Sequence, residues 1–368
     1  MNNLFICDTP FQIIVCLLII KNNRLKNNWF LISDKMNNAD IYAKNMQSIS
    51  CIQGVCSVKT KHNDFDKCKY FFEEVLPYNQ TFKCFAKKTF DYLFVRNYSD
   101  LIVNSAFRYF QKKNENLQLI VYDEGYSSYT HDFWNSQNNY SLAHSSLNKI
   151  LKMLGKKYPY EYINRALFFK PDFIFPEFPF TKERLIGKNF SLSNLDIVDI
   201  NRIFEYKPLT TELPSHSVIF FEECFSEDYG DNSDLLILKE ITNIIGKNNI
   251  FIKLHPRTTK DRFTSMGYKV LSNINYPWEV FAINNPSSDI LQISFSSGSL
   301  VNYLFFTQTR IKSLYLFKAF PEYYQNIQNN MEIRKWFNKI ENENKDCIYI
   351  PETLNDMKNY LSSYVKRI

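Results

Sequence analysis

The sequence predicts an α/β protein with two domains, each built on a parallel sheet that helices cover on both faces. Its 368 residues are enough for two domains of ordinary size. Short apolar runs alternate with longer stretches of helical periodicity, which is the pattern of parallel strands and their crossover helices. Aromatic residues make up 17% of the chain, a content that argues against disorder.

The first domain begins with a buried strand at 3–7, NLFIC. Thr9 and Pro10 then suit the cap and the first turn of a helix. Three further buried strands are expected at 28–34, 90–95 and 117–125. Between the last two, residues 99–113 have apolar positions at helical spacing, and Ser99 is the expected cap.

A change of character around 170–216 indicates a linker region, because Pro, Phe and polar residues occur there without clean periodicity. Strands then resume and are expected at 217–223, 249–254, 268–272, 289–294, 311–317 and 347–351. Helices are expected at 233–247, after Ser297, and at the C-terminus. The predicted boundaries are an N-terminal domain at 1–205 with its linker from about 175, a C-terminal domain at 216–350, and a final helix at 351–368.

Charge and apolar runs limit the class of protein. The net charge of +6 is spread along the chain, which fits an anionic small-molecule substrate or an anionic membrane surface better than nucleic acid. The apolar run Ile13–Ile20 is too short to span a bilayer, and no basic residue precedes it. We therefore expect a cytoplasmic protein, with peripheral contact at the membrane. The eight cysteines show no CxxC and no zinc-type spacing, so reduced thiols are expected.

The first candidate for chemistry is the YDEG stretch at the end of a buried strand. Asp123 and Glu124 follow the strand, and Gly125 allows a tight turn. One of two adjacent carboxylates can serve as a general base. A solvated acidic turn is the alternative. In sheets of Rossmann type, ligands bind beyond the carboxyl ends of the strands, and this position favours a functional role.

The second candidate is KLHPR, where Pro256 ends a strand just after His255. An imidazole there can protonate a departing phosphate oxygen near neutral pH. Lys253 lies two residues earlier and points to the same side of the strand, so the pair suits an anionic leaving group. The alternative is a histidine that only forms hydrogen bonds at a strand end.

The third candidate is SFSSGS, which contains Ser296 and Ser297 and follows another strand. Hydroxyls and backbone N–H groups at a helix N-terminus bind anions. A serine that merely caps a helix is the alternative. Neither GxxxxGK[ST] nor GxGxxG occurs, which favours a nucleotide-sugar over ATP or NAD.

Two acidic residues and one absent motif complete the candidates. Asp228 could be a second acid, and Glu279 could bind ribose hydroxyls, although a capped helix start explains Glu279 as well. No DxD pair occurs in a plausible strand-end context, so no metal is expected. A CMP-sugar, whose leaving group is a phosphate monoester, needs a metal less than a diphosphate does.

The order of these motifs resembles that of bacterial sialyltransferases of GT-B architecture, which carry an acidic D/E-D/E-G motif, then HP, then a paired Ser/Thr. The matching residues here are Asp123-Glu124-Gly125, His255-Pro256 and Ser296-Ser297. The opening CDTPFQ, with Thr9 and Gln12, also resembles the T-P-x-Q of the lipooligosaccharide sialyltransferases, glycosyltransferase family 52. Related bacterial polysialyltransferases share the three motifs.

The resemblance implies two Rossmann-like domains facing a central cleft, and an inverting, metal-independent transfer of sialic acid from CMP-sialic acid to a hydroxyl of a lipooligosaccharide or capsular glycan. Asp123 would be the general base, with Glu124 as the second choice, and His255 the general acid. Ser296 and Ser297 would hold the phosphate. Lys253 and Glu279 match weaker features of related enzymes, the latter toward the ribose. A homodimer is also implied.

Other hypotheses stay open. A GT-B enzyme with another donor, such as CMP-Kdo or a UDP-hexose, would use the same kind of site. A nucleotide-sugar epimerase has the same two-domain plan. A glycan-binding subunit without activity is a third alternative, but it would have no need of an acid opposite a base. The sequence leaves the acceptor and the linkage open.

Overall fold

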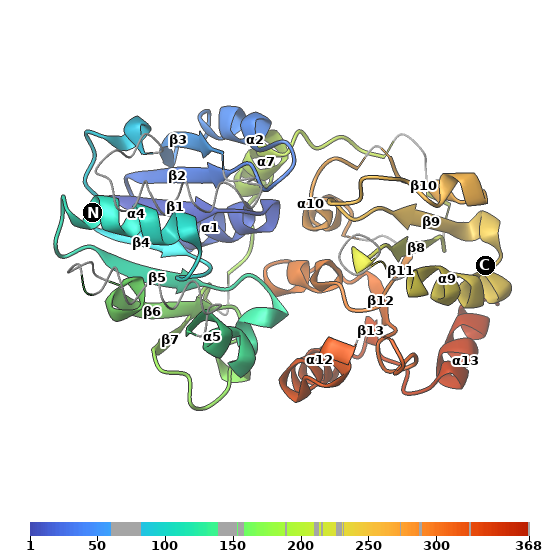
Figure 1. Cartoon of the computed structure of the whole chain (residues 1–368). Coiled ribbons are helices and arrows are strands. Elements are labelled where there is room, and N and C mark those ends of the chain that lie inside the picture. The colour runs from blue at the N-terminus through green and yellow to red at the C-terminus, as the bar shows by residue number, and fades with distance from the viewer. Residues whose placement is uncertain are drawn as a thin grey trace. The chain divides into compact units, whose positions relative to one another are not determined.

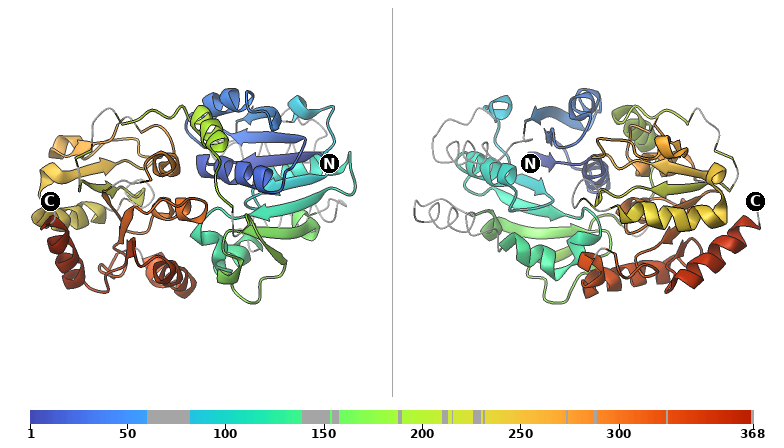
Figure 2. Two further views of the ribbon diagram at one scale, coloured as in Figure 1. Left: turned by 180° about the vertical axis from the view of Figure 1, so that it is seen from behind. Right: turned by 45° about the vertical axis from the view of Figure 1, so that its right-hand side comes forward.

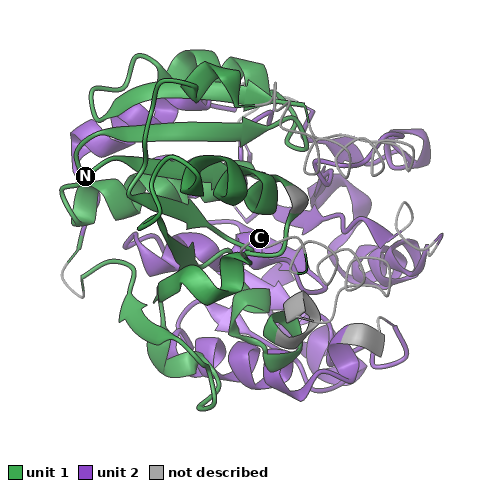
Figure 3. Cartoon of the chain, turned by 60° about the vertical axis from the view of Figure 1, so that its left-hand side comes forward, with its two compact units in different colours: residues 1–190 green, residues 191–368 purple. Residues whose placement is uncertain are grey.

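The chain forms two compact units, Met1–Phe190 and Ser191–Ile368, which Figure 3 colours separately. The computed structural model describes residues 1–59, 82–138, 153, 158–187, 190–209, 213–214, 216–225, 230, 232–272, 274–286, 289–323 and 325–366. Each unit has its own parallel sheet and its own buried apolar core (Figure 1).

The first unit holds a seven-stranded sheet in the order β3-β2-β1-β4-β5-β6-β7, and every pairing in it is parallel. The strands are β1 (Asn3–Cys7), β2 (Asn28–Ser33), β3 (Ile52–Val58), β4 (Tyr92–Val95), β5 (Gln118–Tyr122), β6 (Ile163–Phe168) and β7 (Thr181–Arg184). The first six follow the Rossmann order 3-2-1-4-5-6, in which the strand order reverses between β1 and β4. A ligand crevice is expected at that reversal.

Helices cover both faces of this sheet, with α1 and α4 on opposite sides (Figures 1 and 2). The helices are α1 (Pro10–Asn22), α2 (Ala39–Met46), α4 (Leu101–Gln111) and α5 (His131–Asn138), with 3-10 turns η1 (Lys83–Phe85), η2 (Tyr126–Tyr129), η3 (Pro159–Tyr162) and η4 (Pro171–Phe173). The Thr9 hydroxyl caps α1 as predicted, whereas Asp100 rather than Ser99 stands at the N-cap of α4. Residues 11–20 of α1 are all buried, which explains why all of them except Gln12 are apolar. Among the described residues, no helix is long and apolar enough to cross a membrane.

The second unit repeats the same plan with six parallel strands in the order β10-β9-β8-β11-β12-β13. The strands are β8 (Val218–Phe221), β9 (Ile250–Lys253), β10 (Lys269–Val270), β11 (Leu291–Ser294), β12 (Lys312–Tyr315) and β13 (Ile348–Tyr349). Read in chain order this is again 3-2-1-4-5-6, so the reversal falls between β8 and β11. The predicted fold class, α/β with two Rossmann-like units, is confirmed.

The helices of the second unit correct two expectations. They are α7 (Asn194–Ile203), α9 (Ser233–Ile245), α10 (Trp278–Asn284), α11 (Gln325–Gln328), α12 (Met331–Glu343) and α13 (Leu354–Val365), with 3-10 turns η5 (Lys247–Asn249), η6 (Thr264–Met266), η7 (Gly298–Leu300) and η8 (Asn302–Phe305). The stretch read as a linker contains β7 and α7. The helix expected after Ser297 is only the pair of short turns η7 and η8, because Gly298 and the β-branched Val301 are weak helix formers.

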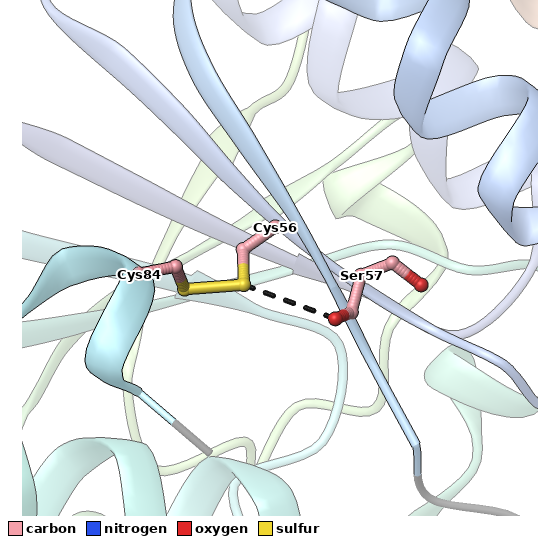
Figure 4. Close-up of a disulfide and its surroundings, with 3 residues drawn as sticks. All are labelled: Cys56, Ser57 and Cys84. Carbon is pink, nitrogen blue, oxygen red and sulfur yellow. Dashed lines mark hydrogen bonds between the residues drawn. A yellow bond between two sulfur atoms is a disulfide. The ribbon is translucent and has the colours of Figure 1, made fainter. Parts of the chain in front are cut away.

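One disulfide overturns the expectation of reduced thiols for two of the cysteines. Cys56 on the edge strand β3 is bonded to Cys84 in η1, with their Cα atoms 6.4 Å apart (Figure 4). The sequence interval between them is 28 residues, so spacing along the chain gave no sign of the pair. They meet because η1 lies beside the outermost strand of the sheet.

Candidate functional site

In the first unit, a charged cluster lies at the carboxyl ends of β1, β4 and β5. Its centre is Arg96, the residue after β4. Its Nη1 donates to both carboxylate oxygens of Glu124, at 3.1 and 3.0 Å. Its Nε lies 3.4 Å from Oδ2 of Asp8, and its Nη2 lies 3.1 Å from Oδ2 of Asp100. This Arg96 cluster, Arg96 with Asp8, Asp100 and Glu124, therefore spans the reversal point of the first sheet.

The Arg96 cluster gathers more negative than positive charge. Burial alone would lower the pKa of Arg96, but the three carboxylates outweigh burial and raise it. Burial raises the pKa of Asp100 to about 6, although Arg96 opposes the rise. Lys35 adds a second cation, 3.9 Å from Asp8. Arg96 was not singled out in the sequence, although it directly follows a predicted strand, and that position was the signal that could have found it.

Asp123, the first choice as a general base, lies fully buried beneath the turn that follows β5. Its Oδ1 accepts the N–H of Gly125 at 2.8 Å. Its Oδ2 accepts the N–H of Phe169 at 3.1 Å and the hydroxyl of Tyr129. Burial raises the pKa of Asp123 to about 7, against these hydrogen bonds. The carboxylate therefore fixes the turn, and both of its oxygens accept hydrogen bonds from within the protein.

Gly125 makes that turn possible. Its φ of 124° lies in a region of backbone conformation that residues with a side chain rarely adopt. Its N–H reaches back to Asp123, so the third residue of the acidic motif holds the first in place. The motif is thus a rigid corner that leads from β5 into η2.

Glu124, the second choice as a base, points to the cluster instead. Its side chain is 12% exposed, and besides Arg96 it accepts Nε2 of Gln12 at 3.0 Å. Oε1 of Gln12 in turn accepts the N–H of Asp8 at 2.7 Å. The structure therefore brings Gln12 and Glu124 together, and Thr9 supports Gln12 by capping the helix that carries it.

In the second unit, two consecutive carboxylates follow β8. Glu222 is buried, and its Oε2 accepts the N–H of His255 at 3.1 Å and the hydroxyl of Thr258. Its Oε1 accepts Nη2 of Arg262 at 2.9 Å. Arg262 also pairs with Asp234 at 2.6 Å, in the first turn of α9. The loop that carries His255 is therefore fastened to the sheet through Glu222.

His255 is half-buried, and its backbone and ring are both engaged. Its Nδ1 accepts the N–H of Arg257 at 3.1 Å. In this geometry the hydrogen of a neutral ring lies on Nε2. Pro256 is exposed and separates the two residues that this hydrogen bond joins. In this tautomer the ring carries its N–H donor on Nε2.

Glu223 lies next to Glu222 but serves the other neighbouring loop. Its Oε1 accepts the hydroxyl of Ser294 and the N–H of Ser296, and its Oε2 accepts the hydroxyl of Ser296 at 2.9 Å. Burial raises the pKa of Glu223, and the hydrogen bonds oppose that rise. The Ser294 hydroxyl also accepts the N–H of Ser297 at 2.9 Å. Both carboxylates fall at the end of the strand expected at 217–223, but no role was predicted for either of them.

The two serines of the paired motif lie in different surroundings. Ser296 is 2% exposed and directs its hydroxyl inward to Glu223. Ser297 is half-exposed, and its Oγ accepts the N–H of Ser299 at 3.4 Å. The Tyr315 hydroxyl donates to the backbone carbonyl of Ser297 at 3.0 Å. Ser297 is thus the better placed of the two for an external ligand.

Lys253 and Glu279 form a second charged group in this unit. Burial lowers the pKa of Lys253 to about 8, although the charges of Glu279 and Glu222 oppose the fall. Glu279 is buried in the first turn of α10, where Nδ2 of Asn302 donates to it at 2.9 Å. Burial raises the pKa of Glu279. Asp228, the other acidic candidate, lies outside the described residues.

This chain is similar to solved structures and to one protein family. Among curated proteins, none matches this chain. Two similar solved structures are those of the spinosyn forosaminyltransferase SpnP and of the glycotransferase of kitacinnamycin. The first is 11% identical to this chain with a TM-score of 0.44, and the match covers 100% of this chain and 99% of the forosaminyltransferase chain. The second is 8% identical to this chain with a TM-score of 0.49, and the match covers 100% of this chain and 90% of the glycotransferase chain.

The protein is a glycosyltransferase, because the family whose model matches the chain consists of glycosyltransferases. In particular, the chain belongs to the alpha-2,8-polysialyltransferase (POLYST) family, whose model matches residues 3–316. That family was named from the sequence as a relative sharing the three motifs. The narrower resemblance to lipooligosaccharide sialyltransferases stays a hypothesis.

Proposed function

We propose that the protein is an inverting sialyltransferase, which moves sialic acid from CMP-sialic acid to a hydroxyl of a bacterial surface glycan. The observation that carries the proposal is the arrangement at the carboxyl end of the second sheet. There the loops of His255 and Ser297 flank the reversal point, where Rossmann-type sheets bind nucleotides. The family supports the choice of sialic acid as the transferred sugar.

The donor phosphate would meet three groups of the second unit. His255 would direct Nε2–H at a phosphate oxygen, and Ser297 would donate its hydroxyl hydrogen. Lys253 would add positive charge as the bond between sialic acid and phosphate breaks. Protonation of the leaving phosphate by His255 needs an imidazolium, and this requires the hydrogen bond from Arg257 to Nδ1 to break first.

Glu124 would be the general base, in place of Asp123, because it is the carboxylate of the acidic motif that has exposed surface. It would take the proton of the acceptor hydroxyl, whose oxygen then attacks the anomeric carbon of sialic acid. The electron pair of the broken bond goes to the phosphate of CMP. Arg96 and Gln12 would orient the carboxylate. The proposal assigns no step to a metal.

Nucleotide release tests the proposal. The protein is incubated with CMP-sialic acid, CMP-Kdo or UDP-hexoses, with and without an oligosialic acid or lipooligosaccharide acceptor, and the nucleotide products are separated by chromatography. We expect CMP from CMP-sialic acid only, at a rate that EDTA does not change. Release from another donor alone would reassign the substrate, and strong inhibition by EDTA would overturn the metal-free step.

A further inference from the structure

We infer that Glu222 and Glu223 are positioning residues, which act on the donor phosphate through the two loops that they hold. The inference rests on the proposed function, since it takes the loops of His255 and Ser297 to face the phosphate of CMP. Neither carboxylate is given a contact with the substrate. Each instead fixes one loop, and each loop supplies one group to the phosphate.

The topology of the sheet explains why consecutive residues can do this. Strand β8 lies between β9 and β11, and His255 and Ser297 follow those two neighbours. Consecutive residues at the end of an extended strand direct their side chains to opposite faces of the sheet, so the two carboxylates do not compete for the same donors. Glu222 bonds the loop after β9, and Glu223 bonds the loop after β11. One strand end thereby sets both sides of the reversal point.

The Glu222 side is a continuous chain of bonds. Its carboxylate receives the backbone N–H of His255, so it fixes the point from which the imidazole projects. Thr258 donates its hydroxyl to the same oxygen, so Glu222 holds the loop at a second point. Arg262 joins the other oxygen to Asp234 on α9. Through these bonds the loop that carries the imidazole is held both to the sheet and to helix α9.

The Glu223 side contains neutral donors. Its carboxylate receives both the N–H and the hydroxyl of Ser296, and the hydroxyl of Ser294. Ser294 connects Glu223 to Ser297, because the Ser294 hydroxyl donates to Glu223 and its oxygen accepts the N–H of Ser297. Ser296 is therefore committed to the interior, and Ser297 alone of the pair is presented outward.

A residue kept only for packing would not need a charge here. Burying a carboxylate is costly unless hydrogen bonds satisfy it, and an apolar side chain of similar size would avoid that cost. Two such carboxylates stand beside a site proposed for an anion, which they would repel. Each carboxylate accepts three hydrogen bonds, most of them from the loops. What the carboxylates provide is therefore the geometry of these loops.

The test compares CMP with cytidine, which lacks the phosphate, by calorimetric titration of the full chain. The variants are Glu223→Gln, Glu222→Gln and the milder Ser294→Ala. Glu240→Gln is the matched control, since Glu240 pairs with Lys358 on the α13 side of α9. We expect Glu223→Gln to raise the Kd of CMP by about tenfold, with cytidine unchanged. Ser294→Ala should act in the same direction by a few-fold.

Glu222→Gln should instead act on turnover. We expect its kcat to fall by about 10- to 100-fold with the Kd of CMP within about threefold of the wild type, because a displaced imidazole costs more in the reaction than in binding. A merely structural role would weaken CMP and cytidine equally, or only lower the melting temperature, and either result overturns the inference. If Glu223→Gln does not fold, Ser294→Ala decides by the same ratio of CMP to cytidine affinity.

The proposed donor and the positioning role of the two carboxylates can be refuted separately. A wild-type chain that binds neither CMP nor cytidine would refute the proposed donor, and with it the inference. A wild-type chain that binds CMP and transfers sialic acid, while the variants keep the wild-type ratio of CMP to cytidine affinity and the wild-type kcat, would refute the inference alone.

Discussion

Asp123 and Glu124 are consecutive, yet their carboxylates have opposite surroundings. That of Asp123 is enclosed by Gly125, Tyr129 and Phe169. That of Glu124 keeps exposed surface and is gripped by Arg96 and Gln12. The two isosteric amide variants should therefore have different effects, one on stability and the other on catalysis.

Glu124→Gln should lower kcat by about 10²–10⁴-fold, because the amide cannot accept the proton of the acceptor hydroxyl. The Kd of CMP should not change. Steady-state transfer kinetics and calorimetry of CMP binding measure the two quantities. A variant that keeps its wild-type kcat would remove Glu124 from the mechanism.

Asp123→Asn should change how stability depends on pH. Burial raises the folded-state pKa of Asp123 to about 7, above the ordinary value of 3.8. The folded chain then holds a proton that the unfolded chain releases, so this contribution is complete below about pH 4 and is lost as the pH rises toward 7. The free energy of unfolding of the wild type, relative to Asp123→Asn, should fall by up to ~4 kcal/mol between these limits. Urea unfolding at pH 4.5, 6 and 7.5 measures it, and a constant difference would contradict the raised pKa.

Lys253 should make CMP binding sensitive to pH above neutrality. Its pKa is lowered to about 8 by burial, so its charge is lost as the pH rises through 8. We expect the affinity for CMP to fall by up to about tenfold per pH unit beyond that point. Lys253→Arg should remove the fall, because a guanidinium stays charged throughout this range. The same pH profile in wild type and variant would show that Lys253 does not face the donor.

The paired serines should separate in the same way as the paired carboxylates. Ser297→Ala should weaken CMP without affecting cytidine and should leave the melting temperature unchanged. Ser296→Ala should lower the free energy of unfolding by ~1–3 kcal/mol, because it leaves an oxygen of Glu223 without its donor. Thermal unfolding and titration of both variants check this, and the reverse pattern would exchange the two roles.

The disulfide should contribute stability only under oxidising conditions. Cys84→Ser should lower the free energy of unfolding by ~2–4 kcal/mol, as expected when a loop of this length is no longer closed. In the presence of a reductant, wild type and variant should unfold at the same denaturant concentration. A difference that persists after reduction would mean that packing of Cys84, rather than the bond, is responsible.

Strands with continuous apolar sequence were predictable, because burial on both faces leaves that signature. Those at 3–7, 28–34, 90–95 and 117–125 are all present as β1, β2, β4 and β5. The edge strand β3 was missed, since only its two end residues are buried and its sequence, IQGVCSV, includes a glycine and polar residues. The edge strand β7, TKER, carries no apolar residue at all and fell within the expected linker.

The strand-end position of the candidate residues was predictable from sequence, but their hydrogen bonds were not. The rule that ligands meet the carboxyl ends of strands selected Glu124, His255 and Ser297 from sequence. Which oxygen accepts which hydrogen depends on neighbours far along the chain, such as Gln12 and Glu124, which are 112 residues apart. The inward orientation of Asp123 and Ser296 follows from such contacts and could not be read from the motifs.

The order of the strands also bears on how the protein is made. All seven strands of the first sheet lie between residues 3 and 184, and all six of the second lie between residues 218 and 349. No pairing in the described residues joins a strand of one sheet to a strand of the other. A ribosome therefore finishes every strand of the first sheet before it starts the second, so the first half can fold while the second is still being translated.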